Sequence, residues 1–163
     1  MDRTYTPADV TVRDIDPIPV TIMEHRGDPA LIGDTVQRFI AWRKAHGLPP
    51  AASRTFNIFY SNPHTTPPAQ YRLGLCVGTD TAPGPFGKGM RHDHIPGGRY
   101  AVLRCVGDEH ALDRAIVYLC RDWLPASGEQ MEHVPPFCER VRFFPHVPAK
   151  DAVTDFFLPL QSR

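Results

Sequence analysis

One acidic residue in an apolar setting has the clearest chemical potential in this sequence. The segment FCERVRFF, which begins at Phe137, has the two-residue alternation of a strand. This alternation places Glu139 on one face with Phe137, Val141 and Phe143, while arginines mark the other face. Because a carboxylate removed from water without a partner costs several kcal/mol, the charge of Glu139 needs compensation.

Three environments would satisfy this carboxylate. Glu139 can form an internal ion pair with Arg72 or Arg104, since charged residues inside proteins are mostly paired. A bulge in the strand can instead turn Glu139 towards water. In the third arrangement Glu139 lies in an aromatic cleft, where charge and cation–π contact attract a flat, positively charged molecule. The sequence leaves all three open.

The same cleft could serve an enzyme. A carboxylate in an apolar setting has a raised pKa and can act as a general acid or base, and Tyr60 could donate a proton to a leaving oxygen. Other nucleophiles are not favoured: the sequence contains no Gly-x-Ser-x-Gly motif, and Cys138 faces away from Glu139 by alternation.

Two further motifs could hold a metal or a cofactor. His92 and His94 fall on one face of an extended segment, but no third ligand has a recognisable spacing, which favours a polar edge strand. The glycines of IPGGRYAVLRCVG do not form G-x-G-x-x-G, so a dinucleotide site is not expected. The sequence predicts no metal and no cofactor.

A repeat along the chain indicates which elements position these residues. VTIMEHRGDPALIGDTVQRFIAW and YAVLRCVGDEHALDRAIVYLCRDW each contain an alternating strand, Gly-Asp, and a helical pattern that ends near Trp. Their glycines, Gly27 and Gly107, lie 80 positions apart. Such an internal period is evidence for a duplicated architecture.

The two helices have matching signals. Asp28 and Asp108 are suitable N-caps because a short carboxylate accepts bonds from the amides of the first turn. Each helix has an apolar stripe at helical spacing. The predicted stripes are Ile32, Val36, Phe39 and Ile40, and Leu112, Ala115, Ile116, Leu119, Cys120 and Trp123.

Two strands follow each helix, FNIFY with YRLGLCV and FCERVRFF with VTDFFLPL, and one strand precedes each unit, VTVRDI or RHDHI. We therefore predict an α+β fold, a tandem repeat of strand–helix–strand–strand units with an antiparallel sheet, two main helices and pseudo-twofold symmetry. The repeat units cover about residues 10–80 and 90–161 of a single domain, 1–163.

Composition narrows the class of protein. The 163 residues include 18 Lys and Arg and 18 Asp and Glu, a balance that gives no reason to expect direct binding to nucleic acid or membrane. Four scattered cysteines predict buried thiols in a reducing compartment. No stretch approaches the ~20 apolar residues of a membrane helix. We expect a cytoplasmic monomer.

The order of several motifs resembles the GyrI-like small-molecule-binding domain, which also serves as the effector-binding half of AraC- and MerR-type regulators. The resemblance covers about residues 10–160. It is carried by EHRGD, IFYSNPHTTPP, IPGGRYAVLRCVG, WLPASG, PPFCER and VTDFFLPL.

This resemblance implies a bacterial protein with two lobes and a ligand groove where the lobes meet. In multidrug-sensing relatives an acid on the penultimate strand attracts lipophilic cations, and by position that acid is Glu139. Other relatives bind DNA gyrase, and some free-standing relatives hydrolyse cyclopropane-bearing alkylators. This chain departs from the family pattern at Val141, where an aromatic residue is common, and at Gly74, where an Asp is common.

We therefore expect a free-standing small-molecule-binding protein rather than an enzyme, with a lipophilic, cationic ligand in the groove between the repeat units. The alternatives are a hydrolase of cyclopropane-type toxins, with Glu139 and Tyr60 as catalytic residues, and a gyrase-interacting protein. The predicted ligand-binding residues are Glu139, Phe56, Tyr60, Tyr118, Trp123 and Phe137.

Overall fold

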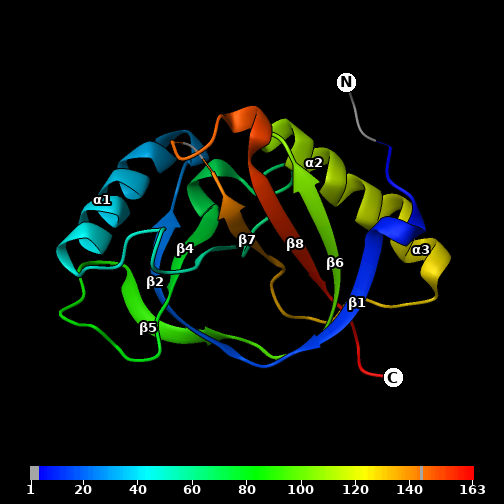
Figure 1. Ribbon diagram of the computed structural model, residues 1–163, viewed down its shortest axis with the longest axis horizontal. Helices are drawn as coiled ribbons and strands as arrows, with labels where there is room; N and C mark the ends of the chain where they lie inside the picture. Colours follow the sequence, from blue (N-terminus) through cyan, green and yellow to red (C-terminus); the bar gives the residue numbers. More distant parts are fainter. Residues whose placement is uncertain (1–3, 144) are drawn as a thin grey trace. The chain divides into compact units, whose positions relative to one another are not determined.

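The computed structural model describes residues 4–143 and 145–163. The chain divides into two compact units, which are described separately (Figure 1). Unit 1 combines the described residues up to Asp16 with Gly97–Arg163, and unit 2 is the continuous segment Pro17–Pro96. In the part of the chain that the structure describes, no helix is both long and apolar enough to cross a membrane.

Unit 2 is an antiparallel sheet with strand order β3-β4-β2-β5 and one long helix, α1, which lies along β2 (Figure 1). The strands and the helix are β2 (Ile18–Arg26), α1 (Ile32–Ala45), β3 (Thr55–Ile58), β4 (Arg72–Gly78) and β5 (Met90–Ile95). Two single 3₁₀ turns, η2 (Pro29–Leu31) and η3 (Pro68–Gln70), belong to its connections.

Unit 1 has the corresponding strand order, β1-β6-β8-β7, and α2 lies along β6 and β8 (Figure 1). Its main elements are β1 (Val10–Ile15), β6 (Gly98–Val106), α2 (Glu109–Val117), the π-helical segment η4 (Tyr118–Trp123), α3 (Leu124–Ser127), β7 (Phe137–Arg142) and β8 (Val153–Pro159). Its 3₁₀ turns are η1 (Pro7–Asp9) and η5 (Ala149–Asp151).

The predicted fold class is confirmed: the protein is α+β, with antiparallel strands and two main helices. The two units are compatible with an internal repeat, because each contains strand, helix, strand and strand in that order. The strand that precedes each predicted repeat, however, pairs within the unit built around the other helix. β1 pairs with β6, and β5 pairs with β2.

The bend from strand to helix has the same chemistry in both units. Gly27 and Gly107 have positive φ angles of 108° and 138°, in the region that glycine adopts without strain. A Cβ atom at Gly107 would lie 2.7 Å from the Cβ of Ala111. Asp108 accepts a hydrogen bond from the amide of Ala111, so the predicted cap of α2 is confirmed. Asp28 accepts from the amide of Ala30 and caps the 3₁₀ turn η2, which precedes α1, whereas the N-cap residue of α1 itself is Leu31.

The buried face of α1 differs from its predicted stripe. Thr35, Phe39 and Arg43 are buried at a spacing of four residues, whereas Ile40 is 39% exposed, so the prediction for Ile40 is wrong. Arg43 takes the inward position because its guanidinium donates to the segment after the helix. The acceptors are the carbonyls of Leu48 and Ser53 and the hydroxyl of Thr55.

The buried face of α2 follows the predicted spacing through Leu112, Ala115 and Leu119. Cys120 is exposed, so its predicted burial is wrong, while the other three cysteines are buried. The π-helical turn adds an extra residue per turn around this position, and this rotates side chains away from a strictly α-helical stripe. Gly128 then ends the helix in the left-handed region, with φ 77°.

Candidate functional site

The predicted acid lies on the face of the unit 1 sheet that points away from α2, here called the α2-distal face. Arg140 forms an ion pair with Glu109 in the first turn of α2, with Nη1 2.8 Å from Oε1. Because successive side chains of a strand point to opposite faces, Glu139 and Phe137 point away from that helix. The facing predicted by alternation therefore agrees with the structure at these positions.

A second acid lies directly across the ladder from Glu139. Asp155 is the pairing partner of Glu139 on one side and of Arg104 on the other, and residues paired in this way share a face. Arg104 binds Asp155 through both ends of its guanidinium, with Nε–Oδ1 2.8 Å and Nη2–Oδ2 2.9 Å. The hydrogen bonds to Asp155 and the negative charge of Glu139 raise the pKa of Arg104.

Two carboxylates lie directly opposite each other in this cluster. Glu139 and Asp155 pair across neighbouring strands, and Arg104 forms its bidentate pair with Asp155. Like charges in this position repel. A positive charge that approached Glu139 would reduce this repulsion.

Three aromatic rings lie on the same face of the sheet as these charges. Phe137 stacks on Phe157 with centroids 4.4 Å apart and planes within 10°, and Tyr100 meets Phe137 edge-on at 5.3 Å. The guanidinium of Arg13 lies 5.5 Å from the centre of the Phe157 ring. Phe137 and Tyr100 are at most 1% exposed, so these rings belong to the buried core.

In unit 2 the face that points away from α1, the α1-distal face, carries a different charged cluster. Met23, Leu75 and Val77 pack with Phe39 of α1, so their strand neighbours point to the other side. One of those neighbours is Glu24, whose side chain is only 1% exposed.

Three arginines bind the buried carboxylate of Glu24. Arg72 donates from Nε to Oε2 at 2.7 Å and from Nη2 to Oε1 at 2.9 Å. Arg91 Nη1 donates to Oε1 at 3.0 Å, and Arg26 Nε donates to Oε2. The hydrogen bonds from Arg72, then those from Arg26 and Arg91, lower the pKa of Glu24 from 4.5 to about 2, against the opposing effect of burial.

Tyr60 completes this second cluster. Arg91 Nη2 donates to its hydroxyl at 2.8 Å, and the guanidinium carbon of Arg72 lies 4.6 Å from the ring centre. Gly74 makes room for the ring, since a Cβ atom there would lie 3.1 Å from Cε2 of Tyr60. Burial raises the pKa of Tyr60, so the phenol stays neutral.

The two clusters occupy equivalent rows of their sheets. In each unit, one residue from each of three neighbouring strands forms a row across the sheet. These strands are β2, β4 and β3 in unit 2, and β6, β8 and β7 in unit 1. The rows are Glu24–Gly74–Ile58 in unit 2 and Arg104–Asp155–Glu139 in unit 1.

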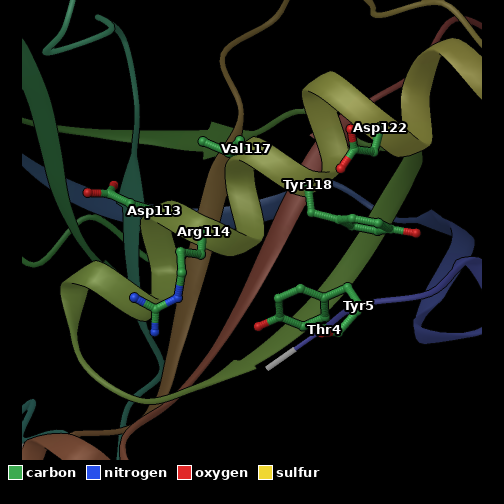
Figure 2. Close-up of a pocket in the computed structure, with 7 residues that line it drawn as sticks. All are labelled: Thr4, Tyr5, Asp113, Arg114, Val117, Tyr118 and Asp122. Carbon is green, nitrogen blue, oxygen red and sulfur yellow. The ribbon is translucent and has the colours of Figure 1, made fainter. Parts of the chain in front are cut away.

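A surface hollow of about 400 Å³ lies beside α2 and the N-terminal segment of unit 1 (Figure 2). Tyr118 and Tyr5 line it with ring centroids 5.6 Å apart, together with Asp113, Arg114 and Asp122. Tyr118 thus belongs to the helix side of the sheet, whereas Glu139 points away from α2. The structure does not bring these two predicted ligand-binding residues together.

The remaining predicted residues also separate. Phe56 is fully buried in β3, with the guanidinium of Arg54 4.9 Å from its ring centre. Tyr60 lies just past the end of β3, in the cluster around Glu24, and Trp123 ends the π-helical segment. Within unit 1 only Glu139 and Phe137 share a face, and the ligand-binding role of all six residues stays a prediction.

The sequence reasoning missed Asp155 and Glu24. Alternation could have found both: Glu24 follows Val20 and Ile22 on one face of its strand, and Asp155 lies between Val153 and Phe157 on one face of another. Arg72 and Arg104 were considered as ion-pair partners of Glu139 in one of three alternatives. In the structure their bidentate bonds go to Glu24 and Asp155, respectively.

Among residues 4–143 and 145–163, no three or more His, Cys, Asp or Glu side chains form a group that could hold a metal ion. His92 Nδ1 lies 3.5 Å from the hydroxyl of Thr21 and 3.4 Å from that of Thr79. His94 lies beside Asp93, with Nδ1 3.6 Å from Oδ1.

Comparison of the sequence with known families identifies the family of this fold. Residues 8–161 match the GyrI-like small molecule binding domain, and the chain belongs to that family. The probable transcriptional regulator YgiV of Escherichia coli strain K12 is 36% identical over 154 residues, which cover 93% of this chain and 96% of that protein.

Solved structures share the fold at low sequence identity. The C-terminal domain of EcmrR has a TM-score of 0.72 and 14% identity, with 94% of this chain and 98% of that chain covered. SAV2435 bound to tetraphenylphosphonium has a TM-score of 0.60 and 9% identity, with 93% of both chains covered. The protein is thus a GyrI-like small-molecule-binding domain related to regulators of transcription.

Proposed function

We propose that this protein is a binding protein that captures a lipophilic cation at the α2-distal face, with Glu139 as the residue that supplies the attracting charge. The observation that carries this proposal is the row Glu139–Asp155–Arg104, in which the carboxylate of Glu139 lies directly opposite that of Asp155. A cationic ligand would relieve the repulsion between the two acids and gain charge attraction from Glu139.

The surroundings favour an apolar cation over a hydrated one. Phe137, Phe157 and Tyr100 form an aromatic cluster on the same face, and aromatic rings attract organic cations through their negative faces. Glu139 is half-buried, so a ligand that contacts it displaces water from the carboxylate. The tetraphenylphosphonium bound to SAV2435, which shares the fold, is a ligand of this chemical class.

Calorimetric titration with tetraphenylphosphonium and with neutral triphenylphosphine oxide tests the proposal. Glu139→Gln keeps the size of the side chain and removes its charge. We expect it to weaken binding of the cation by about 1–3 kcal/mol, the range of a charge-assisted contact. Binding of the neutral compound should change by less than a factor of about two, because it has no charge for Glu139 to attract.

Glu132→Gln is the matched control, because it removes the same charge from an exposed side chain before β7. This control should bind both compounds as the wild type does. An equal loss for the cation and the neutral compound in Glu139→Gln, or wild-type protein that takes up neither, would reject the proposal. Hydrolysis of a cyclopropane-type toxin by Glu139 and Tyr60, binding to DNA gyrase, and a groove between the repeat units stay predictions.

A further inference from the structure

We propose that the α1-distal face of unit 2 holds a binding site for the oxyanion group of a small molecule, a carboxylate or a phosphate. The guanidinium groups of Arg26, Arg72 and Arg91 would bind the anion, and Glu24 would hold these three groups in place. This site uses other residues than cation binding at Glu139 and has the opposite charge preference, so either can fail without the other.

The first argument is the charge of the cluster. Three guanidinium groups surround the single carboxylate of Glu24, which leaves two positive charges in excess. Asp93, with Oδ2 3.7 Å from Arg91 Nε, offsets one of them. Burial keeps the phenol of Tyr60 protonated, so it adds no negative charge. A buried carboxylate needs one bidentate arginine for compensation, and Arg72 alone supplies it.

The second argument is the direction of the donors. Glu24 uses Nε of Arg26, Nε and Nη2 of Arg72, and Nη1 of Arg91. In the part of the chain that the structure describes, no protein acceptor binds the two Nη groups of Arg26 or Nη1 of Arg72. These groups lie at the outer ends of forks that match the geometry of a carboxylate or phosphate.

The carboxylate of Glu24 is buried, whereas the guanidinium donors around it reach solvent. The side chain of Glu24 is 1% exposed, whereas those of Arg26, Arg72 and Arg91 are 71%, 43% and 38% exposed. An approaching anion therefore meets guanidinium groups and not the buried acid. Since Glu24 already fixes one edge of each guanidinium, less side-chain entropy remains to be lost on binding.

Tyr60 adds a further donor and an aromatic surface. Its hydroxyl oxygen accepts from Arg91 Nη2, so its own O–H proton can point to a bound anion. Its ring lies against the guanidinium of Arg72, 4.6 Å from ring centre to Cζ, in the place that Gly74 leaves open. An anion attached to an aromatic ring could contact this surface as well as the arginines.

An NMR titration of the full chain tests this inference. The Nε–Hε signals of ¹⁵N-labelled arginines are followed at low ionic strength while sodium benzoate or sodium phosphate is added. We expect saturable shifts at Arg26, Arg72 and Arg91, and at least about fivefold weaker binding in Arg26→Gln, which removes one of the charge-assisted contacts. A tighter benzoate complex would assign an aromatic carboxylate, and a tighter phosphate complex a phosphate group.

Arg38→Gln is the matched control. Arg38 belongs to α1 of the same unit and is exposed, with Nη2 3.2 Å from the carbonyl oxygen of Lys88. It should change binding by less than a factor of about two, since an exposed charge outside the site acts only through screened solvent. Non-saturating shifts with both anions, or equal weakening in Arg26→Gln and Arg38→Gln with both variants folded, would overturn the proposal.

Discussion

Replacing Glu24 by Gln should reveal how much one buried carboxylate stabilises unit 2. Hydrogen bonds from three arginines lower the pKa of Glu24 from 4.5 to about 2. Since a tenfold change in proton affinity corresponds to about 1.4 kcal/mol, this shift corresponds to about 3 kcal/mol of folding free energy. The guanidinium groups reach solvent, which screens their attraction, so we expect Glu24→Gln to lose about 2 kcal/mol at pH 7.

The difference in stability between wild type and Glu24→Gln should depend on pH in a defined direction. A carboxyl group whose pKa is lowered by folding stabilises the protein fully above its unfolded pKa, and this contribution disappears as pH falls through the folded pKa. The difference between wild type and Glu24→Gln should therefore be constant above about pH 5. It should shrink to less than about half by pH 3 and nearly vanish around pH 2.

Urea unfolding, followed by circular dichroism at several pH values between 7 and 3, measures the difference. The pKa of Glu129 is also lowered to about 2, by its hydrogen bonds to Arg99 and then Arg163, but this group is present in both proteins and cancels. Glu132→Gln, an exposed control, should show no such trend. A difference below about 0.5 kcal/mol at pH 7, or one that stays constant down to pH 3, would refute the reasoning.

Two further substitutions test the strand-to-helix bend of unit 1. Gly107→Ala places a Cβ atom 2.7 Å from that of Ala111 at a φ of 138°. We expect the free energy of unfolding, measured by chemical denaturation, to fall by about 2–4 kcal/mol. A loss under about 1 kcal/mol would contradict this. Asp108→Ala removes the cap on the amide of Ala111 and should cost about 1 kcal/mol, with Asp108→Asn close to wild type as the control; equal losses in both variants would contradict a capping role.

Local chemistry in the sequence predicted much of the fold. Gly-Asp at both bends and the alternating strands each depend on contacts between near neighbours. The predicted burial of Ile40 and Cys120 was wrong because a helical stripe fixes only the average direction of burial. In α1 the three hydrogen-bond acceptors of Arg43 decided the inward position, and these lie beyond the helix in the chain.

The candidate sites depended on information that is not local. Alternation correctly gave the direction of Glu139, since facing requires only the strand itself. It could not give the neighbours of Glu139, because the row with Asp155 and Arg104 is set by the register of three strands. For the same reason the sequence offered Arg72 as a partner for Glu139, whereas the register places it beside Glu24.

The exchange of edge strands has a consequence for the order in which the chain can fold during translation. Unit 2 is continuous from Pro17 to Pro96, so every strand it needs has been synthesised before the second half emerges from the ribosome. β1 precedes unit 2 in the chain but pairs with β6, with Val10 opposite Leu103, so its partner strand is synthesised only after all of unit 2. β1 would therefore acquire its native neighbours later than the strands of unit 2, although it is synthesised before them.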